Sequence, residues 1–556
     1  MKSSTHPLFL GAYLGFALLF SIQVVPNLSW NSLTNDEAFE ITNGYYYLTQ
    51  GDVAAEQEHV PLAGALEALP LLFLHLQTQP FQGDSFDRSH LFMFVWNQER
   101  LLTVTFWART VDWLFGLAIG FLIFQIARRE PVWAAACLIL WAFNPTLLAM
   151  AGLAKTDIPA TFFFFLAVWL YERKENLGPR AGFWIGVAVG AAVTAKLSCI
   201  VLIPVFLLFE ILEAVHLKKF FGKRFKNTFV NGTWILSGIL IWIGILYLPG
   251  SLFLPDHQWP WAYLGEKFMD LTAFSQRPYP VFFWGQPSLQ NHWIYYPVTF
   301  VLKSPLPFVL LLGAGVFISI RKKITVPILW WLTVVVFGMS ILPVSNQGIR
   351  YLLPAFPFLI LIAGKAAAWF WAQGQKKNRG YLKFLAGGFL IWQIASVLVN
   401  FPQDLSYFND LVPSDKKLFL LADSNLDWSQ DNRRLEAMAQ KRGWTQVKLA
   451  YLGGVDPSVY GLSWEPWREK DLKGPQPGWV YLVNASFLQL GPSFYPSVLP
   501  IARSWINQMP PTGKVADSWY YFEIPGKAMA DSSPFLPSVP FQQYRGYVSY
   551  RPGSRE

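Results

Sequence analysis

The polar residues of this chain gather into two kinds of cluster, which fall at opposite ends of its apolar segments. Almost every neighbouring pair of opposite kind is separated by a hydrophobic stretch long enough to cross a bilayer. Clusters of the first kind are short and basic: Arg128-Arg129, Arg173-Lys174, Lys218-Lys219 with Lys223-Arg224, Arg321-Lys322-Lys323, and Lys376-Lys377 with Arg379. This alternation predicts that all basic loops lie on one side of a membrane and all candidate reactive groups on the other.

The composition supports a membrane protein. Hydrophobic residues make up 53% of the 556 residues and charged residues only 14%, far below the share of a soluble domain. The net charge of +9 resides mainly in loops beside apolar spans, which the positive-inside bias explains better than a nucleic-acid surface does. Cys137 and Cys199 both lie inside apolar stretches, so we expect neither a disulfide framework nor a zinc module.

The apolar runs predict about eleven transmembrane helices. The first run has no small-residue cleavage site behind it and is therefore interpreted as a retained signal anchor, with the N-terminus in the cytoplasm. Counting lysines and arginines then places residues after 400 on the extracytoplasmic side. The predicted spans are 7–26, 104–127, 132–150, 157–172, 181–195, 198–215, 231–250, 305–320, 326–343, 351–372 and 383–400.

These spans predict an all-α polytopic membrane bundle over residues 1–400, which includes a first outer loop (27–103) and a later one (251–304). An apolar stretch from Pro61 to Leu76 is expected to lie along the membrane interface as a helix.

Residues 401–556 are expected to form an extracytoplasmic α/β domain. Strands are predicted over 417–421, 446–451, 479–483 and 514–524, and a helix over 429–441.

Asp36 and Glu37 form a pair of carboxylates about ten residues beyond the first span, beside a run of aromatic residues. A carboxylate there can bind a sugar and take a proton from an acceptor hydroxyl, especially if partial burial shifts its pKa toward the working pH. The alternative is a helix cap at Asn35 or Asp36.

Glu58 and His59 follow in the same loop. A Glu-His pair can ligate a divalent metal, bind a sugar or simply anchor the loop, and its spacing has no metal-specific signature.

Lys155 and Asp157 open the fourth span, where Thr156 and Pro159 are also typical of an ordinary helix start. Lys196 lies between two apolar spans. An ionisable residue at that depth indicates function by default, and the alternative is a lysine that reaches the headgroups.

Lys303 and the Arg350-Tyr351 pair begin two later spans on the outer side, where cations run against the positive-inside bias. A phosphate would account for them, and arginine is the better phosphate ligand because of its planar fork. Alternatively, Arg350 pairs with an acid of the outer loops. The tail segment 423–431 is dense in hydrogen-bonding side chains, which either line a sugar or acceptor site or form turns around a buried tryptophan.

Taken in order, these motifs resemble the polytopic GT-C glycosyltransferases, in particular the bacterial relatives of protein O-mannosyltransferases and of the lipid A aminoarabinose transferases. The motifs that carry the resemblance are Asn35-Asp36-Glu37, the Tyr-rich helix with Gly44 and Leu48, Gly51-Asp52, Glu58-His59-x-Pro61-Leu62, Asn144-Pro145, Thr156-Asp157-x-Pro159-Ala160-Thr161, Lys196, Lys303-Ser304-Pro305, Gly348-x-Arg350-Tyr351-Leu352-Leu353-Pro354, Tyr407-Phe408-Asn409 and Asp423-Ser424-Asn425-Leu426-Asp427-Trp428.

The resemblance implies transfer of a sugar from a polyprenyl-phosphate donor, with inversion, at the outer face of a bacterial inner membrane. Asp36 matches the general base of the family, and Glu37 would support it. Asp157 matches the second acidic position, which binds or orients substrate. The lipid phosphate would be held by Arg350 with Lys155, Lys196 and Lys303.

The chain departs from the family in having Glu58-His59-Val60-Pro61 where relatives often have His-Pro-Pro, in carrying Lys155 before Thr-Asp, and in having Ser429 where glycine is common. None of these changes removes a charge that the mechanism needs. No cofactor is required, since the cations can replace a metal ion. The expected acceptor is a protein hydroxyl, a lipid glycan or a cell-wall polymer.

Two other functions compete with a glycosyltransferase. One is a transporter or flippase of lipid-linked sugars, against which we count the large outer loops, the lack of charged residues at mid-membrane helix positions and the lack of an evident pair of pseudosymmetric halves. The other is a non-catalytic receptor or scaffold that uses the tail as its binding module.

Overall fold

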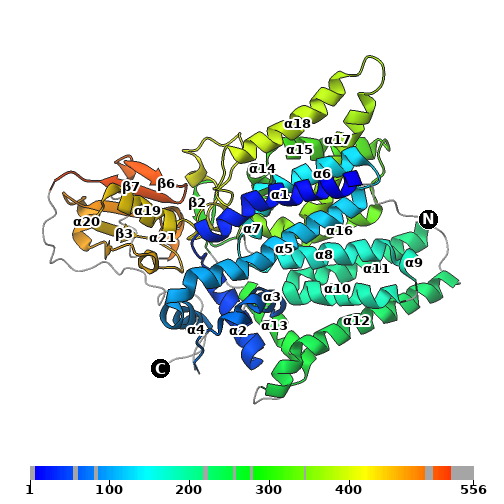
Figure 1. The fold of residues 1–556 in the computed structure, drawn as a ribbon, viewed down its shortest axis with the longest axis horizontal. Helices are drawn as coiled ribbons and strands as arrows, with labels where there is room; N and C mark the ends of the chain where they lie inside the picture. Colours follow the sequence, from blue (N-terminus) through cyan, green and yellow to red (C-terminus); the bar gives the residue numbers. More distant parts are fainter. Residues whose placement is uncertain are drawn as a thin grey trace.

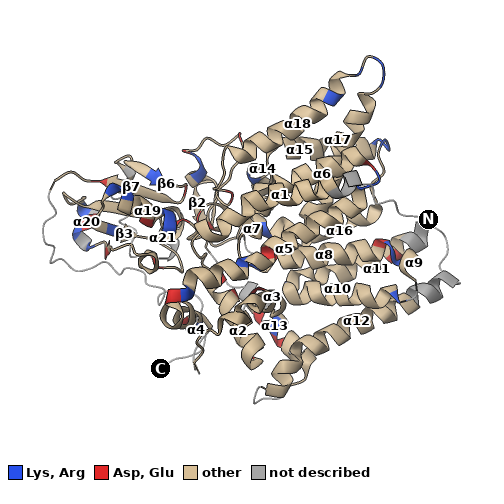
Figure 2. Cartoon of the chain, in the orientation of Figure 1, with Lys and Arg blue, Asp and Glu red and all other residues tan. Residues whose placement is uncertain are grey.

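The computed structural model describes residues 7–53, 60–79, 85–178, 180–216, 223–253, 258–275, 280–342, 346–494 and 505–526. Most of these residues are helical. Long helices form a bundle, and the sheet of the tail lies beyond one end of it (Figure 1). The middles of the long helices are nearly free of charge, whereas charged residues gather at helix ends and in the tail (Figure 2).

Helices occupy every range in which a membrane span was predicted. The two bends follow from proline, which lacks the N–H that a continuous helix needs: α6 and α7 meet at 62° beside Pro145, and α14 and α15 meet at 119° beside Pro305. The helices of the bundle are α1 (Pro7–Trp30), α5 (Leu101–Ala127), α6 (Pro131–Ala142), α7 (Pro145–Ala151), α8 (Asp157–Glu172), α9 (Lys174–Leu177), α10 (Ala181–Ala195), α11 (Leu202–His216), α12 (Lys223–Phe253), α13 (Pro260–Ser275), α14 (Tyr295–Lys303), α15 (Leu306–Ile320), α16 (Ile328–Ile341), α17 (Phe356–Gln373) and α18 (Tyr381–Leu398).

Within the described residues, 5 helices are long and apolar enough to cross a membrane by themselves, or up to 7 if each bent pair counts as one span. Several other apolar helices are shorter than 18 residues, α10 with 15 residues and α16 with 14 among them. The chain is therefore a multi-pass membrane protein, and the full count of about eleven spans stays a prediction.

The first outer loop folds into α2 (Glu37–Gln50), α3 (Leu62–Ala68), η1 (Leu69–Leu74) and α4 (Ser85–Leu91). The expected interfacial helix over 61–76 is only partly observed. Its first half, α3, packs tightly against α2. The backbones approach so closely that a Cβ on Gly44 would lie 1.9 Å from the carbonyl oxygen of Gly64. Only η1 presents large apolar side chains outward, with Phe73 85% exposed.

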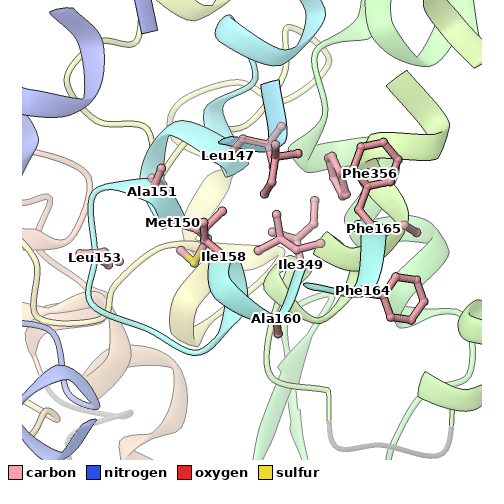
Figure 3. Packing of buried hydrophobic residues seen from close by; sticks show 14 of the residues in the cluster. Leu147, Met150, Ala151, Leu153, Ile158, Ala160, Phe164, Phe165, Ile349 and Phe356 are labelled. Atoms are coloured by element: carbon pink, nitrogen blue, oxygen red, sulfur yellow. The ribbon is translucent and has the colours of Figure 1, made fainter. Parts of the chain in front are cut away.

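A buried apolar cluster joins α7, α8 and the start of α17 (Figure 3). Ile158 of α8 and Ile349, the first residue of the short helix η5 (Ile349–Ala355), lie side by side in this cluster. Both side chains are almost fully buried. Since Asp157 and Arg350 are their chain neighbours, this packing fixes an acid and a cation close together.

The tail contains a five-stranded mixed sheet in the order β4-β3-β5-β7-β6. The strands β3 and β5 pair in parallel from Val447↔Val480 to Ala450↔Val483, while β7 runs antiparallel to both β5 and β6. The tail elements are α19 (Asn432–Arg442), β3 (Val447–Ala450), β4 (Glu465–Pro466), α20 (Glu469–Lys473), β5 (Val480–Asn484), α21 (Ala485–Phe494), β6 (Gly513–Val515) and β7 (Trp519–Glu523).

The strand predicted over 417–421 is wrong. Lys417–Phe419 form a 3-10 helix, η6, which the side chain of Lys417 fixes through a buried ion pair of 2.6 Å with Asp517. Gln489 of α21 donates to the carbonyl oxygens of Leu418 and Leu421. Leu421 also makes an isolated bridge to Phe283, which belongs to a hairpin of β1 (Val281–Phe283) and β2 (Gln286–Ser288). Tertiary contacts thus override the local apolar pattern.

A buried acid joins α1 to the segment that follows α18. Asp404 accepts a hydrogen bond of 2.9 Å from Asn27, and its other oxygen is buried with no hydrogen-bond partner. Burial raises the pKa of Asp404 to about 7, although the hydrogen bond from Asn27 opposes the shift. Folding therefore favours the protonated acid.

We predict that the contribution of Asp404 to the stability of the chain is lost as the pH rises through about 7. Because folding raises the pKa of this acid, its contribution is full below the ordinary pKa of an aspartate and absent above its pKa in the folded chain. The substitution D404N imitates the protonated acid. Its thermal unfolding midpoint in detergent should fall less than that of the wild type between about pH 6 and pH 8, where the wild type loses about 1.4 kcal/mol from Asp404, one pKa unit's worth. Equal slopes for the two proteins would contradict this.

Candidate active site

Asp36 lies one residue before α2, at the end of the bundle that faces the tail (Figure 1). It occupies the N-cap position, but its side chain makes no capping hydrogen bond. Instead, one carboxylate oxygen lies 3.2 Å from Nζ of Lys155 and 3.5 Å from Nη1 of Arg350. The side chain is 33% exposed, whereas those of Lys155 and Arg350 are at most 8% exposed. The acid is thus held by two buried cations and keeps an open side.

Asp157 supplies a second carboxylate beside the first. One of its oxygens lies 2.5 Å from Nζ of Lys196, and the other lies 3.7 Å from Nη1 of Arg350. Arg350 therefore bridges the two acids. Lys196 ends α10, and its ammonium lies 4.3 Å from the ring centre of Tyr351. The ammonium of Lys196 thus points to Asp157 within the protein, which does not favour the alternative in which it reaches the lipid headgroups.

Lys155 is fully buried, in the loop between α7 and α8. Besides Asp36, it contacts Glu40 of α2 at 2.8 Å. Burial alone would lower the pKa of Lys155, but the carboxylates of Asp36 and Glu40 outweigh burial and raise it. Lys155 is therefore a permanent positive charge at the site.

Glu37 has a different environment from Asp36. Its side chain is fully buried and pairs with Arg109 of α5 through two bonds of 2.7 Å. The same carboxylate accepts from the backbone N–H groups of Thr34 and Ala154. Arg109 also donates to the carbonyl oxygens of Leu28, Asn31 and Ser32. With both oxygens occupied, Glu37 supports the loop that carries Asp36, and the geometry does not favour a direct part in proton transfer.

The tail closes over this network. The ring of Trp428 lies 4.4 Å from the guanidinium carbon of Arg350 and 5.7 Å from Nζ of Lys155. Asn425 accepts from the backbone N–H of Ile349 and donates to the hydroxyl of Tyr295. Burial raises the pKa of Asp423, in the same segment, to about 6, and the nearby Arg350 opposes the shift. Segment 423–431 is therefore part of the site and also contains a buried tryptophan.

Gly348 allows the approach of the tail to Arg350. Its φ is 121°, a conformation that side chains rarely adopt, and a Cβ there would lie 2.1 Å from Oγ of Ser424. Ser424 donates to the carbonyl oxygen of Gln347 at 2.7 Å. Only glycine fits at this contact.

Lys303 is buried and donates to the carbonyl oxygens of Leu405 and Asn425, so it holds the tail segment in place. Glu58 and His59 lie outside the described residues. Within the described part of the chain, no group of three or more His, Cys, Asp or Glu side chains could hold a metal ion.

Sequence reasoning missed four ionisable residues of this region: Glu40, Glu67, Arg109 and Asp112. All four are fully buried. Arg109 and Asp112 lie inside the apolar α5, so the prediction that such helix positions lack charged residues is wrong for this helix. An ion inside an apolar span was a readable signal of function or structure.

The sequence matches the family model described as dolichyl-phosphate-mannose-protein mannosyltransferase over residues 90–243. The matched range includes Arg109, Lys155, Asp157 and Lys196 but neither Asp36 nor Arg350. The predicted resemblance to this family is confirmed. None of the curated proteins matches the sequence.

Several solved structures are distantly similar to this chain. ArnT from Cupriavidus metallidurans in the apo state gives a TM-score of 0.46 at 10% identity and covers 92% of this chain and 97% of its own. The same enzyme bound to undecaprenyl phosphate gives 0.44 at 12% identity, with coverages of 94% and 98%. The Archaeoglobus fulgidus oligosaccharyltransferase tethered to an acceptor peptide gives 0.46 at 10% identity, with coverages of 90% and 72%.

We predict that E37Q destabilises the chain strongly while D36N does not. Loss of the Glu37 charge leaves Arg109 buried and unpaired, at a cost of about 3–5 kcal/mol. In D36N each cation keeps one carboxylate, since Lys155 retains Glu40 and Arg350 retains Asp157. Thermal unfolding in detergent measures both variants. An E37Q midpoint equal to that of the wild type would contradict a structural role for Glu37.

Proposed function

We propose that this chain is a membrane glycosyltransferase that moves a sugar from a polyprenyl-phosphate donor to a hydroxyl acceptor at the extracytoplasmic face of the bacterial inner membrane. The sugar is a hexose or a pentose, and the acceptor is a protein or a glycolipid. The configuration of the anomeric carbon is inverted, because the acceptor attacks directly from the side opposite the leaving phosphate.

One observation carries the proposal: at the end of an apolar bundle, the partly exposed Asp36 pairs with Lys155 and Arg350, and Arg350 links it to a second acid that pairs with a third cation. Asp36 takes the proton of the acceptor hydroxyl as general base. Its open side gives the acceptor access, and Glu37 with Arg109 fixes the backbone that carries it.

The cations supply the second half of the chemistry. A lipid-linked phosphate is presented at the end of apolar helices, where Arg350 and Lys155 are already buried and Lys196 is 13% exposed. Fixed positive charges stabilise the negative charge that develops on the leaving phosphate, and they need no reorganisation during the reaction. The planar fork of Arg350 suits a phosphate best. In this mechanism the cations replace a metal ion.

The family match supports this assignment. The description of the family names a sugar linked to a lipid phosphate as donor and a protein as acceptor, and the matched range holds Lys155, Asp157 and Lys196. Asp157 orients the substrate through the two cations that it contacts, Lys196 and Arg350.

We predict that D36N lowers turnover by about 10²–10⁴-fold, the usual contribution of a general base, while the affinity for a polyprenyl monophosphate is kept. The measurement is release of polyprenyl phosphate from a lipid-linked sugar, together with binding of radiolabelled polyprenyl monophosphate. D36N should bind this anion at least as tightly as the wild type, since one negative charge is removed from beside the cations.

The matched control is D52N, which removes an acid of the same outer loop that pairs with Arg88 at 2.7 Å, outside the Asp36 network. D52N should turn over at nearly the wild-type rate. A D36N enzyme as active as D52N would refute the role of Asp36 as base. Loss of polyprenyl-phosphate binding in D36N would place its effect in substrate binding.

A further inference from the structure

The face of one tryptophan contacts both cations that hold Asp36. The ring centre of Trp428 lies 4.4 Å from Arg350 Cζ and 5.7 Å from Lys155 Nζ. The tryptophan is only 2% exposed, so no water screens these contacts effectively. A cation over an indole face is attracted by the ring quadrupole, and this attraction grows when water is excluded.

The two cations come from separate parts of the chain, and their like charges repel each other. Arg350 lies in η5, and Lys155 lies in the loop between α7 and α8. Asp36 attracts both, but each also has a second acid: Asp157 for Arg350 and Glu40 for Lys155. Without a further attraction, Arg350 could move toward Asp157 and Lys155 toward Glu40. The indole face that both cations contact opposes this separation.

The backbone of Trp428 is fixed to the Asp36 loop. Its carbonyl oxygen accepts from the N–H of Asn35 at 3.3 Å, one residue before Asp36. The side-chain oxygen of Asn35 in turn accepts from Ser429 Oγ at 2.6 Å and from the N–H of Gly454 at 2.8 Å. The indole and the carboxylate are thus held in one unit, although they are far apart in sequence.

A second set of bonds extends this attachment. The N–H of Ser32 donates to the carbonyl oxygen of Gln430 at 2.8 Å, and the N–H of Arg433 donates to Ser32 Oγ at 2.8 Å. Gln430 also accepts from the N–H of Trp428 at 2.7 Å and so fixes the turn that carries the indole. The tail therefore sets the position of Trp428 relative to the first outer loop.

We propose that Trp428 is a positioning residue that holds Arg350 and Lys155 at the spacing a phosphate requires, which makes the C-terminal region an integral part of the active site. The proposal rests on the proposed function, since it names the residue that arranges the cations of that site. Trp428 itself acts through Arg350 and Lys155 and needs no contact with substrate.

The experiment compares W428F, W428L and W519L in the full-length chain in detergent. Phenylalanine keeps an aromatic face, and leucine keeps only apolar volume. Trp519 is an equally buried tryptophan of the tail, 1% exposed, that packs among the side chains of the sheet. The probe is radiolabelled polyprenyl monophosphate, and its dissociation constant is measured alongside the thermal midpoint of each variant.

W428L should weaken binding about tenfold and W428F less than about threefold, as expected when cation–π contacts are removed or only reduced. W519L should lower the thermal midpoint but leave the dissociation constant of the folded protein unchanged. A W428L affinity equal to that of the wild type would overturn the positioning role, as would an equal loss in W519L. Absence of binding by the wild type would instead refute the proposed function.

Discussion

The architecture of the site depends on the pairing of four cations, Arg109, Lys155, Lys196 and Arg350, with carboxylates. Removing an ammonium or guanidinium group from water is costly, and a neighbouring acid must compensate for it. Arg109 pairs with Glu37, Lys196 with Asp157, and Lys155 with Glu40. Arg350 is shared between Asp157 and Asp36. Of the acids in these pairs, Asp36 is the most exposed, so it is the acid best placed to exchange a proton with a substrate.

This network is assembled from segments that are remote in sequence. The outer loop provides Asp36, α5 provides Arg109, η5 provides Arg350 and the tail provides Trp428. Apolar packing supports this assembly, since Ile158 and Ile349, the chain neighbours of Asp157 and Arg350, belong to one buried cluster (Figure 3). The ion pairs then fix the geometry within each contact. Between helices in a membrane, close van der Waals packing favours association, and the ion pairs restrict the arrangement.

The sequence alone was sufficient to predict the apolar helices, and it predicted Asp36 and Arg350 on one side of the membrane. It offered the ion pair of Arg350 with an outer-loop acid only as an alternative. It could not predict that Glu37 pairs with Arg109, since that contact depends on how α5 packs against the loop. Nor could it decide whether the segment around Trp428 forms turns about a buried tryptophan or lines the site, and the segment does both. The strand predicted over 417–421 failed because Lys417 finds its acid in a distant part of the tail.

The most direct test of the account is the structure of the full-length chain with a bound polyprenyl monophosphate. The account predicts that the phosphate lies between Arg350, Lys155 and Lys196, with at least one oxygen within about 3.2 Å of the guanidinium. It also predicts that the carboxylate of Asp36 faces the space from which the acceptor would attack the sugar. A phosphate bound at the basic loops on the opposite side of the bundle, away from Asp36, would contradict it.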